Sequence, residues 1–177
     1  MKFYKLFRFC PVCGSPEFHQ QNVKSMRCAG CDFSMYVNPS AAVAAFILND
    51  KDELLVGVRA KDPEKGTLDL PGGFVDDDET SEDALRRELR EELTINVDEI
   101  SYLFSLPNQY TYSGWTLPTL DLFYLVKIGT NIVPVPADDV ASCSFVALDR
   151  VDPQQFGLLS IKEAVKRFLK TYKNDIK

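Results

Sequence analysis

Three acidic side chains gather in one short stretch of the chain, at a spacing that would suit a divalent cation. A helix would place Glu88, Glu91 and Glu92 on one side, because residues three and four positions apart share a face. Carboxylates held this close repel one another unless they share a cation, and Mg²⁺ and Mn²⁺ prefer such oxygen ligands. We therefore predict a Mg²⁺ or Mn²⁺ site here, where the ion would polarise a phosphoryl group and activate water.

A solvated charged face is the alternative interpretation of the same stretch. Arg86, Arg87 and Arg90 alternate with the acids and could neutralise them in salt bridges. The tight turn expected at Pro71 to Gly73, together with the spacing of the acids behind it, favours the metal site.

These side chains need a scaffold, and the hydrophobic pattern predicts one. Ser81 to Leu93 reads as a helix with Thr80 or Ser81 as its cap and leucines along one stripe. A second amphipathic helix is expected near the last residues, where apolar side chains recur from Ile161 to Tyr172. The expected strands are Ala41 to Leu48, Glu53 to Arg59, Leu68 to Leu70, Asn96 to Leu106, Leu117 to Ile128 and Ser142 to Leu148. Strands mixed with two helices predict an α/β sandwich, with a turn-rich loop at Pro107 to Gly114.

The stretch from Gly73 to Ile95 closely resembles the Nudix box, G-x5-E-x7-R-E-U-x-E-E-x-G-U, in which U is a bulky aliphatic residue. Every fixed position matches except the late glycine, which is Thr94 here. Leu70 to Gly73 is also typical of that family, and the resemblance covers the chain from about Ala41 onward. It implies a Nudix-type α/β/α sandwich with a mixed sheet and a catalytic divalent metal.

The resemblance also carries roles to matching positions. It makes the three helix glutamates catalytic metal ligands, assisted by the Gly73 carbonyl, and pairs Glu79 with Arg87 as a structural brace. Many members use a further acid on a later loop as base or ligand. Asp139 is our candidate for that role, ahead of Asp138, and a solvated polar turn is the alternative.

Four of the five cysteines form two close pairs separated by 14 residues: Cys10 and Cys13, then Cys28 and Cys31. Four thiolates close a tetrahedral structural zinc site and leave no open position for catalysis. We predict a zinc ribbon over residues 1–37 and a Nudix domain over residues 38–177. Two disulfides or free thiols are the alternatives, and the lack of a recognisable signal peptide argues against disulfides.

A four-cysteine ribbon before a Nudix domain resembles the NADH pyrophosphatase subfamily, which carries S-Q-P-W-P-F-P-x-S after the box. Ser105 to Ser113 keeps both serines, the first proline and an aromatic residue of that pattern, so the match is partial. The predicted substrate contacts are Asn108, Gln109, Tyr110 and Tyr112 for the base and Arg59 for a phosphate. The aromatics could equally be packing residues, and Arg59 an ordinary surface arginine.

Composition narrows the partners. The chain of 177 residues is 45% hydrophobic, enough for a core, and its net charge of −6 makes generic nucleic-acid or anionic-membrane binding unlikely. No apolar run approaches the length of a membrane span, so the expected location is the cytoplasm. Nudix proteins are often homodimers, and nothing in this sequence decides the oligomeric state.

The predicted function is metal-dependent hydrolysis of a nucleoside diphosphate linked to another moiety. NADH or NAD⁺ is the first candidate substrate, and ADP-ribose or another dinucleotide is the next. Two alternatives stand beside it: a non-catalytic nucleotide sensor with a Nudix fold, and a zinc-ribbon nucleic-acid-binding protein. The complete set of glutamates argues for catalysis, since binding alone does not require all of them.

Overall fold

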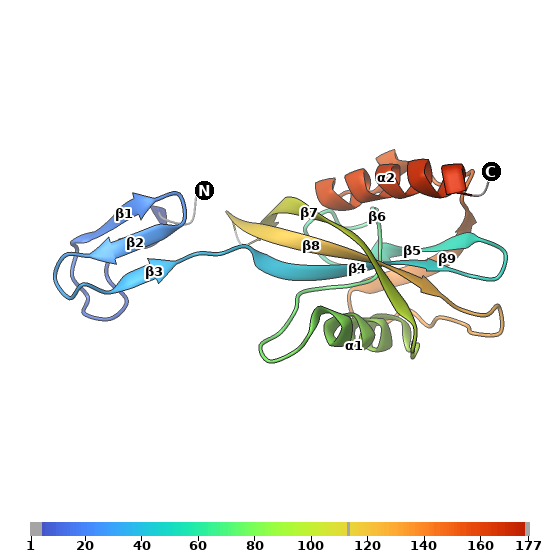
Figure 1. Ribbon diagram of the computed structural model, residues 1–177, viewed down its shortest axis with the longest axis horizontal. Helices are drawn as coiled ribbons and strands as arrows, with labels where there is room; N and C mark the ends of the chain where they lie inside the picture. Colours follow the sequence, from blue (N-terminus) through green and yellow to red (C-terminus); the bar gives the residue numbers. More distant parts are fainter. Residues whose placement is uncertain (1–4, 113, 176–177) are drawn as a thin grey trace. The chain divides into compact units, whose positions relative to one another are not determined.

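The computed structural model describes residues 5–112 and 114–175, which form two compact units (Figure 1). The first unit comprises Met1–Ser40 and Gln109–Thr119, and the second comprises Ala41–Asn108 and Leu120–Lys177. The segment Gln109–Thr119 thus belongs with the cysteine-bearing residues, although it lies far from them in the sequence. The domain boundary after residue 37 stays a prediction.

A six-stranded sheet forms the centre of the second unit. Its strands are β4 (Ser40–Leu48), β5 (Glu53–Arg59), β6 (Leu68–Asp69), β7 (Ile100–Tyr112), β8 (Trp115–Lys127) and β9 (Val140–Ala147). They run in the order β6-β5-β4-β8-β7, and β9 pairs antiparallel with β5. The Ile128 amide donates to the Leu48 carbonyl at 2.9 Å, which joins the carboxyl ends of β8 and β4. These two strands therefore run in the same direction there, and the sheet is mixed.

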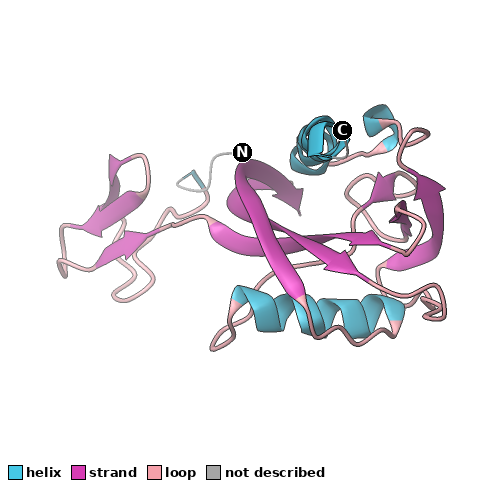
Figure 2. Ribbon diagram, turned by 45° about the vertical axis from the view of Figure 1, so that its right-hand side comes forward, coloured by secondary structure: helices cyan, strands magenta, loops and turns pink. Residues whose placement is uncertain are grey.

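Helices α1 (Ser81–Leu93) and α2 (Leu159–Asp175) cover opposite faces of this sheet (Figure 2). Strand β4 shows why, because its successive side chains point to alternate faces. Val43, Ala45 and Ile47 pack in the cluster that contains Ala84, Leu85, Leu89 and Leu93 of α1. Ala44, Phe46 and Leu48 pack in the cluster that contains Ile161, Ala164, Val165 and Phe168 of α2. The predicted α/β/α sandwich is confirmed.

The two ends of α1 are capped by threonines. The Thr80 hydroxyl accepts a hydrogen bond from the Asp83 amide at 3.1 Å, as expected of an N-cap. Thr94 adopts a left-handed conformation with φ 58°, and its amide donates to the Arg90 carbonyl at 3.0 Å. Threonine therefore makes the left-handed turn for which the Nudix box uses glycine.

A second, smaller sheet of three antiparallel strands lies in the first unit: β1 (Phe18–Asn22), β2 (Ser25–Cys28) and β3 (Ser34–Tyr36). The residues predicted to form the zinc ribbon therefore contain three strands that the sequence analysis did not identify. They are too short for alternation to stand out in the sequence.

The loop expected at Pro107 to Gly114 was also wrong. Strand β7 continues through Pro107 to Tyr112, and β8 begins at Trp115. Proline is tolerated there because β7 lies at the edge of the sheet, where one row of amides needs no strand partner. Ser113, part of the partial subfamily match, lies outside the described residues.

Within residues 5–112 and 114–175, no helix combines the length and the apolar character needed to cross a membrane.

Candidate metal and nucleotide site

The Pro71 to Gly73 turn lies against strand β4. The Val43 amide donates to the Gly73 carbonyl at 2.8 Å, and the Ala45 amide donates to the Pro71 carbonyl at 2.9 Å. Gly72 has φ 146°, and a Cβ built on it would lie 2.1 Å from the Val43 carbonyl oxygen. Only glycine fits at that position, so backbone geometry accounts for this part of the motif.

Glu92 is the buried carboxylate of the site. Only 6% of the residue is exposed, and one carboxylate oxygen accepts a hydrogen bond from the Gly72 amide at 2.9 Å. Burial raises the pKa of Glu92 to about 8 against the effect of that hydrogen bond, and the nearby charges of Glu88, Asp69 and Asp139 act in the same direction as burial. Glu92 therefore sits where negative charge is already crowded.

Glu88 lies beside the same turn and shares one arginine with Glu91. Nη1 of Arg87 donates to Glu88 at 2.8 Å and to Glu91 at 3.3 Å. A Cβ built on Gly73 would lie 2.3 Å from Glu88 Oε1, so the Glu88 carboxylate rests against this glycine. Burial raises the pKa of Glu88, opposed by the Arg87 guanidinium.

Arg87 also makes the predicted pair with Glu79. Its Nη2 and Nε donate to the two oxygens of Glu79 at 2.7 and 3.2 Å, and Nη2 also donates to the Phe74 carbonyl at 3.0 Å. These hydrogen bonds from Arg87, with one from the Asp76 amide, lower the pKa of Glu79. The result is a two-point link between α1 and the loop before it.

The donor set fits a hard divalent cation in its chemistry. Two buried or half-buried carboxylates lie at a turn whose Gly73 carbonyl keeps a second lone pair, and one exposed carboxylate lies on the same helix. The three carboxylates are not drawn together as tightly as the cysteines. In the described part of the chain, the four cysteines alone form a group of metal-ligating residues with atoms within 4.8 Å of one another. Arg87 lies between Glu88 and Glu91 in this arrangement.

Asp139 lies on a segment whose backbone is hydrogen-bonded to the last residues of α1. The Ala137 amide donates to the Glu92 carbonyl at 2.8 Å, which holds this segment at the end of the helix. Lys61 forms ion pairs with both Asp139 and Asp138. The charge of Asp139 is among those that raise the pKa of Glu92.

Arg59 forms an ion pair with Asp69 and donates through Nε to the Pro63 carbonyl at 2.7 Å. Its side chain is 15% exposed, so a large part of the guanidinium is already engaged within the protein. Sequence analysis did not single out Asp69. Its only signal was its place just before Pro71 to Gly73.

The predicted base-reading residues come from strand β7. Asn108 Nδ2 donates to Asp121 Oδ2 on β8 at 3.0 Å, and Asp121 is 6% exposed. Gln109 and Tyr110 fall in the first compact unit. Tyr112 ends β7, and its side chain lies outside the described part. Asp121 was missed from the sequence, because one acid within an apolar strand gives no sign of which face it occupies.

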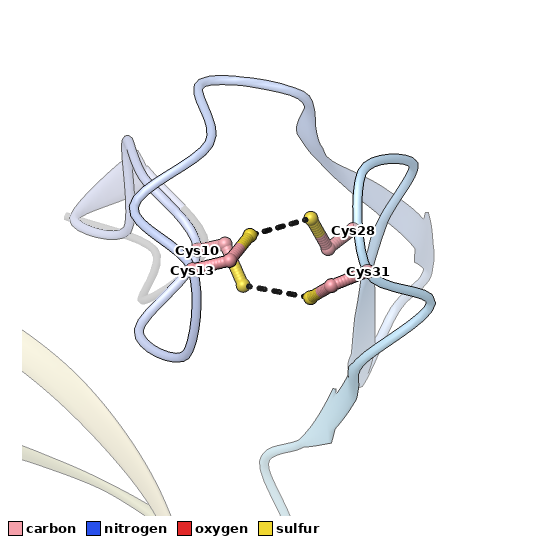
Figure 3. Close-up of side chains that lie close together, drawn as sticks. All are labelled: Cys10, Cys13, Cys28 and Cys31. Carbon is pink, nitrogen blue, oxygen red and sulfur yellow. Dashed lines mark hydrogen bonds between the residues drawn. The ribbon is translucent and has the colours of Figure 1, made fainter.

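The four cysteines converge as predicted (Figure 3). Cys10 and Cys13 lie on one loop, Cys28 ends strand β2 and Cys31 lies in the turn that follows it. Their sulfurs are turned toward a common centre. The Sγ atoms of Cys10 and Cys31 are 3.7 Å apart, and those of Cys13 and Cys28 are 3.6 Å apart. Four thiolates around one zinc ion at tetrahedral geometry would lie about 3.8 Å apart. The cluster therefore fits a zinc ribbon.

Comparison with known proteins agrees with this fold. The NUDIX domain model matches residues 38–169. The NAD-capped RNA hydrolase NudC of Deinococcus radiodurans is 30% identical over 142 residues, which are 77% of this chain and 48% of that protein. The same-named protein of Pseudomonas putida KT2440 is 34% identical over 156 residues, covering 85% of this chain and 51% of its own length. The chain spans about half the length of these curated relatives.

Solved structures agree as well. The MutT NUDIX hydrolase from Burkholderia pseudomallei superposes with a TM-score of 0.62 at 26% identity, over 73% of this chain and 97% of that one. The match covers nearly the whole of that smaller protein.

Proposed function

We infer the function from one premise: this chain belongs to the Nudix family, whose domain model matches residues 38–169. We propose that it is a metal-dependent hydrolase that cleaves the diphosphate linkage of a nucleoside diphosphate joined to another moiety. One observation carries the proposal: the carboxylates of Glu88 and Glu92 flank the Gly72–Gly73 turn, with Glu92 hydrogen-bonded to the Gly72 amide. A binding protein without chemistry has no need for buried, mutually repelling carboxylates there.

The three glutamates would hold the cation together with the Gly73 carbonyl. When bound, Mg²⁺ or Mn²⁺ would supply Lewis-acid activation of the phosphoryl group and of water. The protein's own contribution is positioning. Arg87 and Glu79 fix the loop to α1, and the Gly72 amide orients Glu92, so the carboxylates are held in place before substrate arrives.

Asp139 is the proposed general base. It lies on the segment held at the end of α1, its charge acts on the pKa of Glu92, and about half of its side chain is exposed to water. Lys61 forms an ion pair with the Asp139 carboxylate and would orient it.

NADH or NAD⁺ is the leading substrate, followed by ADP-ribose. Both curated relatives are named as NAD-capped RNA hydrolases, which supports a dinucleotide as the substrate of this chain. Asn108, Gln109, Tyr110 and Tyr112 remain the proposed base contacts, and Arg59 the proposed phosphate contact. Because Arg59 is paired with Asp69, a substrate phosphate would contact the part of the Arg59 guanidinium that stays exposed.

The test is a substrate panel of NADH, NAD⁺, ADP-ribose and diadenosine compounds, with Mg²⁺ or Mn²⁺, in which the products are identified. We expect mononucleotide products that disappear on chelation of the divalent cation and in Glu91→Gln. Binding of a dinucleotide without turnover across the panel would instead support the nucleotide-sensor alternative.

A second candidate substrate is an RNA whose 5′ end carries the dinucleotide. The ribbon departs from the acidic character of the chain: among its described residues, the charged side chains are Lys5, Arg8, Lys24 and Arg27 against Glu17 and Asp32. Two aromatic rings, Phe9 and Tyr36, are 58% and 60% exposed and could stack on bases. Steep weakening of capped-RNA binding with salt, absent for the free dinucleotide, would support this candidate.

A further inference from the structure

The single tryptophan of the chain connects two features far apart in the sequence. Trp115 begins strand β8 and packs against the ribbon core formed by Cys10, Phe18, Met26 and Cys28. Two of these four core residues are predicted zinc ligands. The contact lies within the first compact unit, to which the hairpin tip Gln109–Thr119 belongs.

The ribbon core is too small to hold this arrangement by burial alone. Its fully buried apolar residues are the four just named, and the partly buried residues around them are Phe7, Phe33, Met35, Val37 and Trp115. Domains below about 40 residues usually need a metal, disulfides or association to fold. The free thiols of all four cysteines, gathered within 4.8 Å, leave a metal as the stabilising element.

We propose that zinc in the four-cysteine site sets the conformation of the hairpin tip, and that Trp115 is the positioning residue that transmits this. Zinc binding forms the ribbon core, and Trp115 then has a surface on which to pack. Loss of zinc removes that surface, so the tip loses the Trp115 contact and keeps cross-strand contacts such as the 3.2 Å hydrogen bond between the hydroxyls of Thr111 and Thr116.

This coupling gives the ribbon a part in substrate recognition. Gln109 and Tyr110 lie on the same hairpin tip as Trp115. The inference about recognition rests on the proposed function, in which these two residues contact the base. The inference about zinc and Trp115 does not, because it concerns the packing of one side chain.

Tryptophan fluorescence tests the packing directly, since Trp115 is the sole source of the signal in the full-length protein. Removal of zinc by a chelator, verified by metal analysis, should shift the emission of Trp115 to longer wavelength as the ring becomes exposed. Addition of zinc should restore it. An unchanged emission spectrum after verified zinc loss would overturn the proposal, whatever the protein hydrolyses.

Zinc affinity provides the reciprocal test, because coupling between two sites acts equally in both directions. Trp115→Ala should weaken zinc binding about tenfold, the equivalent of about 1.4 kcal/mol. Trp115→Phe keeps an aromatic ring and should retain most of the affinity, which also guards against a variant that simply misfolds. Val23→Ala is the matched control, because Val23 is in the same ribbon but 86% exposed. Equal zinc affinity in Trp115→Ala and Val23→Ala would contradict the coupling.

Kinetics separate this role from general stability. If the tip reads the substrate, Trp115→Ala should raise KM for the dinucleotide with little change in kcat, and Trp115→Phe should rescue KM. If Trp115 emission shifts and zinc affinity falls but KM for the dinucleotide is unchanged, zinc and Trp115 are coupled and the hairpin tip does not read the substrate. A fall in kcat at unchanged KM would contradict the positioning role.

Discussion

The Glu92 carboxylate accepts a hydrogen bond from the Gly72 amide at 2.9 Å, which ties the last turn of α1 to the turn before the helix. The contact spans twenty residues of sequence. It holds the most buried acid of the site against a backbone that only glycine can form. The position of the Glu92 carboxylate therefore depends on the glycine turn that packs against strand β4.

The two adjacent glycines should fail in different ways when replaced by alanine. At Gly72 the new Cβ would meet the backbone of Val43, which cannot move away, and φ is in the region that glycine favours. Gly72→Ala should therefore destabilise the protein by about 2–4 kcal/mol. At Gly73 the atoms nearest to the new Cβ would be those of the flexible Glu88 carboxylate. Gly73→Ala should change stability by less than about 1 kcal/mol and still lose most activity.

Denaturant unfolding and dinucleotide hydrolysis, measured on both variants, decide this. Equal losses of stability in Gly72→Ala and Gly73→Ala would show that the turn does not lie where we describe it.

The Arg87–Glu79 pair should give the protein a pH-dependent stability. Hydrogen bonds from Arg87 lower the pKa of Glu79, so the folded state favours the charged carboxylate. The stabilisation is complete above the ordinary pKa of glutamate and is lost as pH falls through the lowered value. Glu79→Gln should therefore melt a few degrees below the unmodified protein at neutral pH, and the difference should shrink in acid.

Melting temperatures across the acid range check this, with Glu82→Gln in the exposed first turn of α1 as the control. A gap that stays constant with pH would argue against the charged pair.

Asp138 and Asp139 offer a matched test of the proposed base. Both pair with Lys61, and the charge of Asp139 is among those that raise the pKa of Glu92. Asp139→Asn should lower kcat by about 10²–10⁴, the range expected for loss of a general base. Asp138→Asn should leave kcat nearly unchanged, and asparagine tolerates the left-handed backbone at that position, where φ is 45°. A larger loss of kcat in Asp138→Asn than in Asp139→Asn would show that Asp139 is not the general base.

Much of the scaffold could be predicted from the sequence, because local signals and tertiary packing agree there. The bounds of α1 follow from a threonine cap and a leucine stripe, and Glu53 to Arg59 was predicted as the strand that β5 forms. The pairing of Glu79 with Arg87 came from the family resemblance, and the structure contains it.

The remaining features depend on contacts between distant residues. The part of strand β7 from Pro107 to Tyr112 was mistaken for a loop, because Pro107 reads as a breaker unless the strand is known to lie at a sheet edge. The packing of Trp115 on the ribbon core joins residues that nothing in the linear pattern connects. The burial of Asp69 and Asp121 likewise depends on which strands become neighbours.

Direct measurement of Mn²⁺ binding, by its electron paramagnetic resonance signal in protein whose ribbon is already saturated with zinc, tests the central claim. The unmodified protein should bind Mn²⁺ at the glutamates, and Glu92→Gln, which keeps the shape of the side chain and its acceptor for the Gly72 amide, should weaken that binding at least about tenfold. Equal Mn²⁺ affinity in the two proteins would contradict the claim that these carboxylates hold the catalytic metal.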